Sequence, residues 1–365
     1  MAVKSVLVTG GTGLIGSHLS GRLAQDGYDV TVLGRSSRFA VPEAVPDELR
    51  SKVCVVSAAP GDFEVLEEQV KNADVIFHKA VSIGMAGSVE SARDYVGANM
   101  ADTAGLIDAL RSSGSRVKKV ILGSSVSVYG EGVYSCGKCG KVRPQPRSVI
   151  HPVSNPVRWD PSCPNCGADI KPVTTPEASD RHGESIYAVT KKAQEDLLCG
   201  VCRQLNIPLS VLRYSTVLGP GQSWHNPITR VLELLSGDKQ PTLHEDGLQT
   251  REFVFIEDVV EANMQAMLKQ DQAIDFFNVS TVRMTLLDFT NALAKAMANS
   301  LKTKPIEPVV DGRLTAGDVR HCWVDCSKLE EKFGFRAHRQ SQEGIQSLTD
   351  WFVRYKGLTS RSVSG

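Results

Sequence analysis

Short apolar runs alternate with amphipathic stretches along much of the chain. Runs with the β-rich composition of buried strands lie at residues 4–9, 27–33, 53–56, 74–80, 120–122 and 208–213. Helices are predicted at 17–25, 63–71 and 95–112, and in the stretch that includes Tyr187. Because strands that alternate with helices form parallel sheets with right-handed crossovers, the pattern predicts an α/β fold with a doubly wound Rossmann sheet.

The regular alternation loosens after residue 213. Helices are predicted at 226–235, 257–268, 286–299, 327–333 and 343–355, and extended segments at 251–255, 275–279 and 305–310. The segment 275–279 follows a helix and can return to the main sheet. Apolar residues at helical spacing, such as Ile345, Leu348 and Phe352, are predicted to be core.

Charge and composition narrow the possible functions. The chain has 365 residues with 41 basic and 41 acidic side chains, and no charged tail argues for nucleic acid or an anionic membrane as a partner. No apolar run is long enough to cross a membrane, and the first strand follows Met1 too closely for a signal peptide. Nine cysteines in such a chain indicate a reducing compartment, so we expect a cytoplasmic protein.

A glycine-rich turn, Gly-Gly-Thr-Gly-Leu-Ile-Gly at residues 10–16, joins the first predicted strand to the first predicted helix. Gly10 allows a tight turn, Gly13 lets the backbone approach a pyrophosphate, and Gly16 lets the helix pack closely on the strand. The start of the helix, around Leu14 and Ile15, offers free amides and the positive end of the helix dipole to the phosphates. Three glycines alone are weak evidence, but their place between a strand and a helix predicts a dinucleotide site.

The end of the second predicted strand bears on the choice of dinucleotide. The acidic residue that binds the ribose 2′-hydroxyl of NAD is absent, and Gly34 stands near the end of the strand. Arg35, Ser36 and Arg38 follow it and can hold a 2′-phosphate. We therefore expect NADP rather than NAD. The alternative is that Arg35 stacks on the adenine and NAD is accepted.

Other residues are expected beside the cofactor because of their place at a strand end or on a helix. Asp62 and Phe63 stand between the third strand and its helix, where Asp62 can reach the adenine. Ala80 ends the fourth strand, and Asn99 lies on the helix that follows. His78, in an apolar strand, is predicted to be a hydrogen-bonded core residue rather than a catalytic one.

Tyr187 and Lys191 are four residues apart on a predicted helix, so their side chains lie on one face. A lysine ammonium beside a phenol favours the phenolate and lowers the tyrosine pKa from about 10. Such a tyrosine can take a proton from a sugar hydroxyl while a hydride leaves for a nicotinamide. Ser124 and Ser125 emerge at the carboxyl end of the fifth strand, where the ligands of such sheets bind.

These features together resemble the extended short-chain dehydrogenase/reductase family, specifically its nucleotide-sugar epimerases and dehydratases. The resemblance covers about residues 3–355 and rests on the runs at 9–16, 61–62, 124–130, 187–191, 213–220, 251–254 and 317–321. It implies an NAD(P)-binding Rossmann domain at 1–130 and 177–215 and a smaller, discontinuous, mainly substrate-binding domain at 216–356. We expect a flexible tail at 357–365 and a homodimer.

The resemblance implies that Ser125 is the catalytic serine, Tyr187 the base and Lys191 its partner. Dehydratases of the family carry Thr-Asp-Glu where this chain has Ser-Val-Ser at 125–127. Because elimination of water needs those carboxylates, a nucleotide-sugar 4-epimerase is favoured, in which hydride passes transiently to a tightly bound nicotinamide cofactor. The alternatives are an NADPH-dependent 4-keto-sugar reductase and a cofactor-sensing regulatory protein, which would not need Tyr187 and Lys191 together.

The substrate implied by the resemblance is a nucleotide-diphosphate sugar. Arg251 and Arg320 would hold its diphosphate, in keeping with bidentate recognition by guanidinium groups. Thr216, which replaces an asparagine of the family, and Asn226 would lie beside the substrate. The cysteine-bearing insert and the runs at 219–223 and 226–227 look like the dTDP-L-rhamnose 4-epimerase-like branch.

Four cysteines form two Cys-x-x-Cys pairs within an insert at 131–176: Cys136 with Cys139, and Cys163 with Cys166. A glycine after each pair permits a knuckle in which backbone amides face the sulfurs. The spacing predicts a closed, structural zinc site of the zinc-ribbon type, with a reactive dithiol or an accidental cluster as alternatives. The segment 141–160 between the two pairs is too polar to form a core, and zinc would fold the excursion that contains it. The remaining cysteines are predicted to face the core: Cys54, Cys199, Cys202, Cys322 and Cys326.

Overall fold

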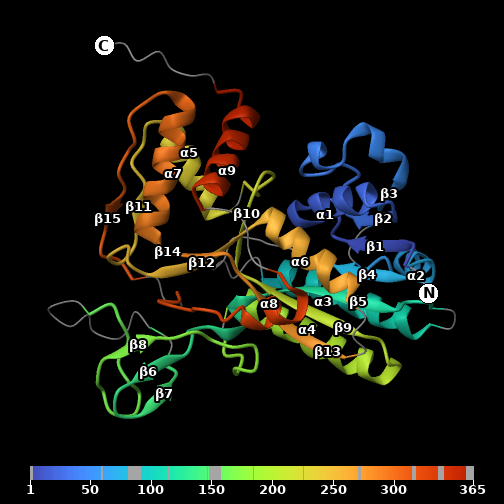
Figure 1. The fold of residues 1–365 in the computed structure, drawn as a ribbon, viewed down its shortest axis with the longest axis horizontal. Coiled ribbons are helices and arrows are strands. Elements are labelled where there is room, and N and C mark those ends of the chain that lie inside the picture. The colour runs from blue at the N-terminus through green and yellow to red at the C-terminus, as the bar shows by residue number, and fades with distance from the viewer. Residues whose placement is uncertain are drawn as a thin grey trace.

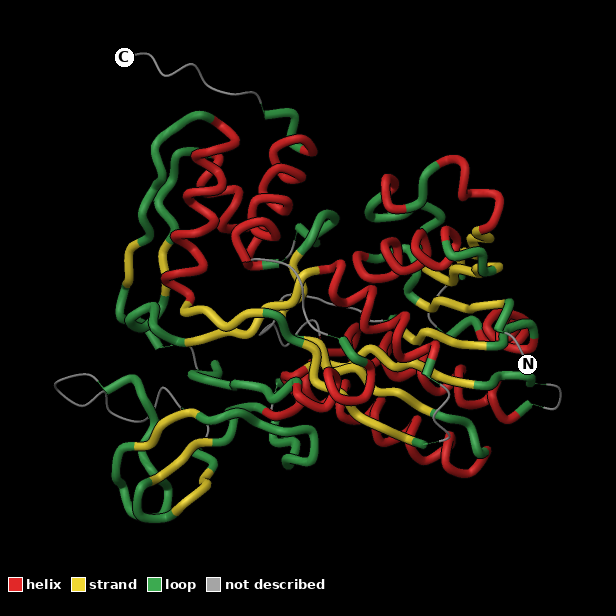
Figure 2. The backbone as a smooth tube through the Cα atoms, viewed as in Figure 1, coloured by secondary structure: helices red, strands yellow, loops and turns green. Residues whose placement is uncertain are grey.

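A computed structural model describes residues 3–58, 61–80, 92–112, 115–145, 147, 158–183, 185–224, 226–269, 273–314, 318–335 and 341–358. Of the tail predicted at 357–365, the part from residue 359 onward lies outside these described residues. Figures 1 and 2 show a large α/β body that holds the N-terminus, a smaller lobe that holds the last helix, and a small strand-rich insert beside them.

Within the described residues, seven parallel strands form the central sheet, in the order β13-β9-β5-β4-β1-β2-β3. Their bounds are Ser5–Thr9 (β1), Asp29–Gly34 (β2), Val53–Ser57 (β3), Val75–His78 (β4), Lys119–Ser125 (β5), Leu209–Tyr214 (β9) and Ile274–Val279 (β13). The strand order reverses between β1 and β4, which is the point where such sheets bind ligands. The predicted doubly wound parallel sheet is confirmed, and the segment at 275–279 does return to it as an edge strand.

Helices cover both faces of this sheet. Val6 and Val8 of β1 pack on one side, against α1, α6 and α8, and Leu7 packs on the other, against α2, α3 and α4. The helices are α1 (Leu14–Gln25), α2 (Phe63–Lys71), α3 (Ala92–Arg111), α4 (Ile186–Leu205), α6 (Ile256–Leu268) and α8 (Ser327–Phe333). Since successive strand residues point to opposite faces, burial on both sides explains the continuous apolar runs in the sequence.

The C-terminal lobe has a core of its own. A three-stranded sheet of order β10-β12-β14 lies beneath α5, α7 and α9, and β11 pairs with β15. The bounds are Thr216–Leu218 (β10), Pro227–Ser236 (α5), Thr242–Leu243 (β11), Thr250–Phe255 (β12), Val282–Thr285 (β14), Leu286–Leu301 (α7), Val309–Val310 (β15) and Ser341–Tyr355 (α9). Because α6 and β13 belong to the body, the lobe is built from separated segments of the chain.

The insert is a small antiparallel sheet of order β7-β6-β8. Its strands are Tyr134–Cys136 (β6), Gly140–Val142 (β7) and Ile170–Pro172 (β8). Figure 1 shows it at the lower left, away from the central sheet and below the lobe. Backbone hydrogen bonds of Thr175 to Trp323 and Asp325 tie its exit to the segment before α8.

Two predictions about individual core residues have different outcomes. His78 is buried and hydrogen-bonded, with Nδ1 2.8 Å from the hydroxyl of Thr9 and Nε2 3.2 Å from that of Thr103, which confirms its core role. Cys202 is fully buried, but Cys54 is exposed and its predicted core position was wrong. Cys54 lies on β3, an edge strand, where an apolar sequence does not ensure cover on both faces. None of the described helices is both long and apolar enough to span a membrane.

Candidate active site

The glycine turn places the start of α1 against the ends of β1 and β4. Gly10 has a left-handed φ of +66°, and a Cβ there would lie 2.7 Å from the backbone of Ala80. A Cβ on Gly16 would lie 2.4 Å from the carbonyl oxygen of Gly10, so helix and turn are in backbone contact. Gly13 precedes the helix without a side-chain cap, and the first turn carries no acidic residue. The first amides of α1 therefore suit an anion such as a pyrophosphate.

The end of β2 lies beside this turn. A Cβ on Gly34 would lie 2.5 Å from the hydroxyl oxygen of Thr12, so an acidic residue would fit here only if Thr12 moved. Arg35 and Arg38 are exposed, and neither forms an ion pair within the described part of the chain. Ser36 folds the turn between them, because its hydroxyl accepts a hydrogen bond from the Arg38 amide at 3.0 Å.

The other predicted cofactor residues are spread along the sheet edge. Ala80 is next to the glycine turn, and its amide donates to the hydroxyl of Thr9 at 3.3 Å. Asn99 is fully buried, and its side-chain amide donates to Thr190 of α4 at 3.3 Å. Asp62 and Phe63 are exposed at the start of α2. The structure thus brings Ala80 to the turn, whereas Asn99 lies between α3 and α4.

Helix α4 carries Tyr187 and Lys191 to the carboxyl end of β5. The ammonium group of Lys191 donates to the carbonyl oxygen of Gly123, in β5, at 2.8 Å. Ser125 ends the same strand, and its hydroxyl accepts from the amide of Ser127 at 3.1 Å. Tyr187 is half-buried, whereas Lys191 is 3% exposed. The predicted serine, tyrosine and lysine therefore come from one strand end and the helix that packs beside it.

A close backbone approach fixes where α4 begins. The amide of Gly183 donates to the carbonyl oxygen of Val128 at 2.8 Å, and a Cβ on Gly183 would lie 2.1 Å from the backbone of the turn after β5. Ser185 then caps the helix, because its hydroxyl accepts from the amide of Ala188 at 3.1 Å. The serine cap and the glycine contact together set the first turn of α4, which carries Tyr187.

Two buried lysines lie close to this strand end. Burial lowers the pKa of Lys191 to about 8, although the nearby Glu195 carboxylate opposes the shift. Lys79, 7% exposed, donates to the hydroxyl of Tyr214 at 3.0 Å and to the carbonyl oxygen of Ile121 at 3.4 Å. Burial and the charge of Lys191 hold the pKa of Lys79 well below its usual range. Lys79 was not among the residues predicted for the site, although a lysine at the end of an apolar strand was a visible signal.

A buried ion pair braces the strands beneath the site. The carboxylate of Glu195, fully buried on α4, accepts from Arg213 of β9 at 2.9 and 2.8 Å. It also accepts from the hydroxyl of Ser124 at 2.6 Å, and Arg213 donates to the hydroxyl of Tyr129 at 2.7 Å. Glu195 was missed as well. Its spacing of four residues from Lys191 put it on the buried face of the same helix.

The four cysteines of the insert come together in one cluster. The Sγ atoms of Cys136, Cys139, Cys163 and Cys166 all lie within 4.8 Å of one another, and those of Cys136 and Cys166 are 3.6 Å apart. Tetrahedral zinc with Zn–S bonds of about 2.3 Å separates sulfurs by about 3.8 Å, so the cluster fits that ion. Gly140 and Gly167 have φ values of +75° and +71°, as the predicted knuckles require. Backbone amides of Lys138 and Cys139 lower the pKa of Cys136 to about 7.

The predicted substrate residues are placed less uniformly. Thr216 is half-buried in β10, and Asn226 caps α5 by accepting from the amide of Ile228 at 2.9 Å. The Arg251 side chain is 23% exposed and pairs with Asp318 at 2.6 Å.

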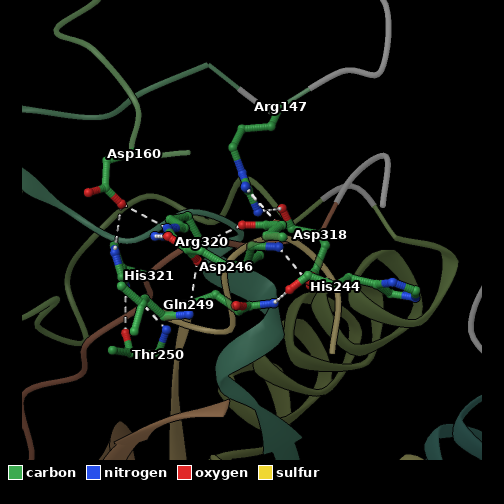
Figure 3. A network of polar contacts seen from close by, with 12 residues as sticks. Arg147, Asp160, His244, Asp246, Gln249, Thr250, Asp318, Arg320 and His321 are labelled. Carbon is green, nitrogen blue, oxygen red and sulfur yellow. Dashed lines mark hydrogen bonds and ion pairs between the residues drawn. The ribbon is translucent and has the colours of Figure 1, made fainter. Parts of the chain in front are cut away.

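Arg320 departs from the expectation that it holds a diphosphate. Its side chain is 2% exposed, and its guanidinium group is already bonded to Asp160, Glu245 and Asp246 at 2.6–3.0 Å (Figure 3). The sequence motif alone could not show that three carboxylates enclose this arginine.

The chain matches two family models that follow each other along its length. Residues 6–149 match the NAD dependent epimerase/dehydratase family, and residues 169–348 match GDP-mannose 4,6 dehydratase. The dTDP-L-rhamnose 4-epimerase of Burkholderia thailandensis is 29% identical, over 96% of this chain and 95% of that relative.

Solved structures show the same fold. UDP-glucose 4-epimerase of Thermotoga maritima, solved with UDP-glucose, has a TM-score of 0.74 at 25% identity and covers 96% of this chain and 99% of its own. UDP-glucuronic acid 4-epimerase of Bacillus cereus, solved with UDP-glucuronic acid and NAD, has a TM-score of 0.76 at 22% identity, with 96% and 99% covered. The chain belongs to the extended short-chain dehydrogenase/reductase family, among the NAD-dependent nucleotide-sugar epimerases and dehydratases.

Proposed function

We propose that the protein is a nucleotide-sugar 4-epimerase that works by transient hydride transfer. The observation that supports the proposal is the contact of α4 with β5: Lys191 donates to the carbonyl oxygen of Gly123, two residues before Ser125, and Tyr187 lies one turn before Lys191 on the same helix. This strand end is separated from the glycine turn of β1 only by β4. A sugar and a dinucleotide bound at the sheet edge would meet there.

The three residues would divide the proton chemistry among them. Tyr187, as a phenolate, takes the proton of the sugar C4 hydroxyl. It returns that proton after the 4-keto sugar has rotated in the site and presents its opposite face to the dinucleotide. Lys191 favours the phenolate while it is charged, and burial sets its pKa at about 8, so the charge is present near neutral pH. Ser125 donates a hydrogen bond to the same sugar oxygen. The bound dinucleotide supplies the hydride acceptor and donor.

The expected dinucleotide is NADP. The lack of space for an acidic side chain at Gly34 and the exposure of Arg35 and Arg38 support a site for a 2′-phosphate. The Bacillus cereus neighbour was solved with NAD, so NAD is the competing choice. KM values for both dinucleotides decide between them, and a clear preference for NAD would contradict the proposal.

The substrate would be a nucleotide-diphosphate sugar whose diphosphate binds Arg251. The relatives named above act on dTDP- and UDP-linked sugars, which supports this class of substrate. Thr216 and Asn226 are proposed neighbours of the sugar nucleotide. We also propose structural zinc at the four cysteines, a cytoplasmic location in keeping with nine cysteines that form no disulfide in the described structure, and a homodimer.

Mass spectrometry of small molecules released from the purified protein should find a nicotinamide dinucleotide. The protein should then interconvert C4 epimers of a dTDP- or UDP-sugar without net change in nicotinamide absorbance. Tyr187→Phe should lower kcat by about 10²- to 10⁴-fold, the usual contribution of a general acid–base, while the dinucleotide remains bound. A fully active Tyr187→Phe variant would refute the assignment.

The second candidate is an NADPH-dependent 4-keto-sugar reductase. The exposed Arg35 and Arg38 favour it, because a reductase needs exchangeable NADPH. Stoichiometric loss of NADPH absorbance with a nucleotide 4-keto sugar would establish this reaction and exclude pure epimerisation.

A further inference from the structure

A network of charged side chains joins the insert to the C-terminal lobe (Figure 3). Glu131, Arg147 and Asp160 come from the insert, Glu245 and Asp246 from the loop before β12, and Arg320 from the segment before α8. The side chains of Arg320 and Glu245 are 2% and 1% exposed, and that of Arg147 is 11% exposed. Arg320 and Glu245 are therefore enclosed between three segments that are distant in sequence, whereas the side chains of Asp160 and Asp246 are 59% and 26% exposed.

Arg320 is at the centre of the network. Its Nε donates to Asp160 at 2.8 Å, one terminal nitrogen donates to Glu245 at 3.0 Å, and both terminal nitrogens donate to Asp246 at 2.6 and 2.9 Å. Its backbone amide donates to Glu131 at 2.6 Å. A diphosphate would have to displace carboxylates that already bind this buried guanidinium group, so Arg320 is not placed to receive one.

Arg251 donates to two groups, on Asp318 and Thr250, and both of these residues are themselves hydrogen-bonded to members of the network. Its guanidinium group donates to the Asp318 carboxylate at 2.6 Å and to the carbonyl oxygen of Thr250 at 2.9 Å. Arg147 donates to the carbonyl oxygen of Asp318 at 2.8 Å, and the amide of Thr250 donates to the carbonyl oxygen of Arg320 at 3.1 Å. If Arg320 or Arg147 moved, the groups that accept hydrogen bonds from Arg251 would lose part of their support, and the orientation of the Arg251 guanidinium group would change.

His321 adds a second tie to the insert. Its Nδ1 lies 2.7 Å from the hydroxyl of Thr250, and its Nε2 lies 3.4 Å from the carboxylate of Asp160. Asp160 is three residues before the zinc-ligand candidate Cys163, so a short stretch of chain joins the network to the cluster. The Arg320–Glu245 pair of the network is buried and resists rearrangement, because a charge that loses its partner there remains desolvated.

We propose that Arg320 is a positioning residue which, with Asp160 and Arg147 of the insert, holds Arg251 in the orientation that binds the substrate diphosphate. The inference rests on the proposed function. It gives the insert a task, namely to pre-organise a binding site that otherwise would have to order when the ligand binds.

Asp160→Asn in the full-length protein tests this by calorimetric binding of UDP and dTDP. We expect Kd for the nucleotide that wild type binds to rise about tenfold, equivalent to about 1.4 kcal/mol. KM should rise more than kcat falls, while zinc and dinucleotide contents stay at wild-type levels, and Asp160→Glu should restore part of the affinity. Asp169→Asn is the matched control, because Asp169 is an exposed insert carboxylate that pairs with Arg158 outside the network. Wild-type affinity in Asp160→Asn would overturn the inference.

Arg251→Ala separates this inference from the proposed function. If Arg251→Ala leaves UDP and dTDP binding unchanged, the proposed diphosphate site is wrong. If Arg251→Ala weakens binding, the double variant Arg251→Ala/Asp160→Asn should bind the nucleotide only slightly more weakly than Arg251→Ala alone. Both changes act on the same contact, that between Arg251 and the diphosphate. Fully additive losses would show that Asp160 acts apart from Arg251 and would also overturn the positioning role.

Discussion

Lys79 is the side chain of the active-site region that least fits its surroundings. Its stem passes beside Gly123, where a Cβ would lie 3.1 Å from the Lys79 Cδ and 3.2 Å from the ring of Tyr214. The amine then reaches the Tyr214 hydroxyl, which is also bonded to Asn263. No carboxylate pairs with Lys79 among the described residues, and burial lowers its pKa below the ordinary value of 10.5. The folded protein therefore favours the neutral amine.

Lys79→Met should raise the free energy of unfolding near neutral pH. In the wild type the unfolded chain binds the Lys79 proton more tightly than the folded chain does. Stability should therefore increase with pH, by up to about 1.4 kcal/mol per pH unit, between the folded-state pKa and 10.5. The variant lacks this group, so its pH dependence should be flatter. Urea unfolding from about pH 6 to pH 9 measures both, and parallel curves for the two proteins would contradict the prediction.

Among single residues, the sequence predicted those that belong to short motifs. The turn at Gly10, the Tyr187/Lys191 pair and the place of Ser125 all follow from short patterns, and the structure assembles them at one edge. Arg320 could not be predicted in the same way, because its partners Glu245 and Asp160 are 75 and 160 residues away in sequence. Its surroundings depend on tertiary packing, which no motif records.

The insert has too small a core to fold by itself. Its strands have three residues each, and its buried cluster consists of few side chains: Tyr134, Cys136, Val142, Cys163 and Ile170. A core of that size does not fold a segment without a crosslink or a metal. The cysteine spacing predicted the cluster, but such short strands carry no periodicity from which their pairing could be read.

Cys136→Ser should remove zinc and loosen the insert while the body stays folded. We expect new proteolytic cleavage within residues 131–176 and retention of the dinucleotide. The Kd for UDP or dTDP should rise by about as much as in Asp160→Asn. Zinc analysis, limited proteolysis and calorimetry measure the three effects. Cys54→Ser is the control, because Cys54 is exposed on β3, far from the cluster. A zinc-free variant that resists proteolysis and binds nucleotide normally would contradict the prediction.

The whole molecule leaves an apolar stripe uncovered on the outer side of α4. Ile186, Val189 and Leu197 are 39%, 52% and 46% exposed and lie at helical spacing, and Val96 of the neighbouring α3 is 47% exposed. Exposed apolar residues on two adjacent helices are consistent with an interaction surface. A second copy of the chain, with α3 and α4 packed against the same pair, would bury the stripe symmetrically. Helical periodicity predicts only the core face of α4, so this second face is recognised from exposure.

Val189→Glu should therefore yield a monomer. A carboxylate buried in an apolar interface would lose its hydration without gaining a partner, which opposes association. Light scattering should give about half the wild-type mass. Because Tyr187 lies in the same first turn of α4, the monomer should also unfold at a lower temperature and lose activity.

Arg203→Glu introduces the same carboxylate on an exposed part of α4 outside the stripe and should remain a dimer. A wild type that is already monomeric, or a Val189→Glu variant of unchanged mass, would rule out this face as the dimer interface.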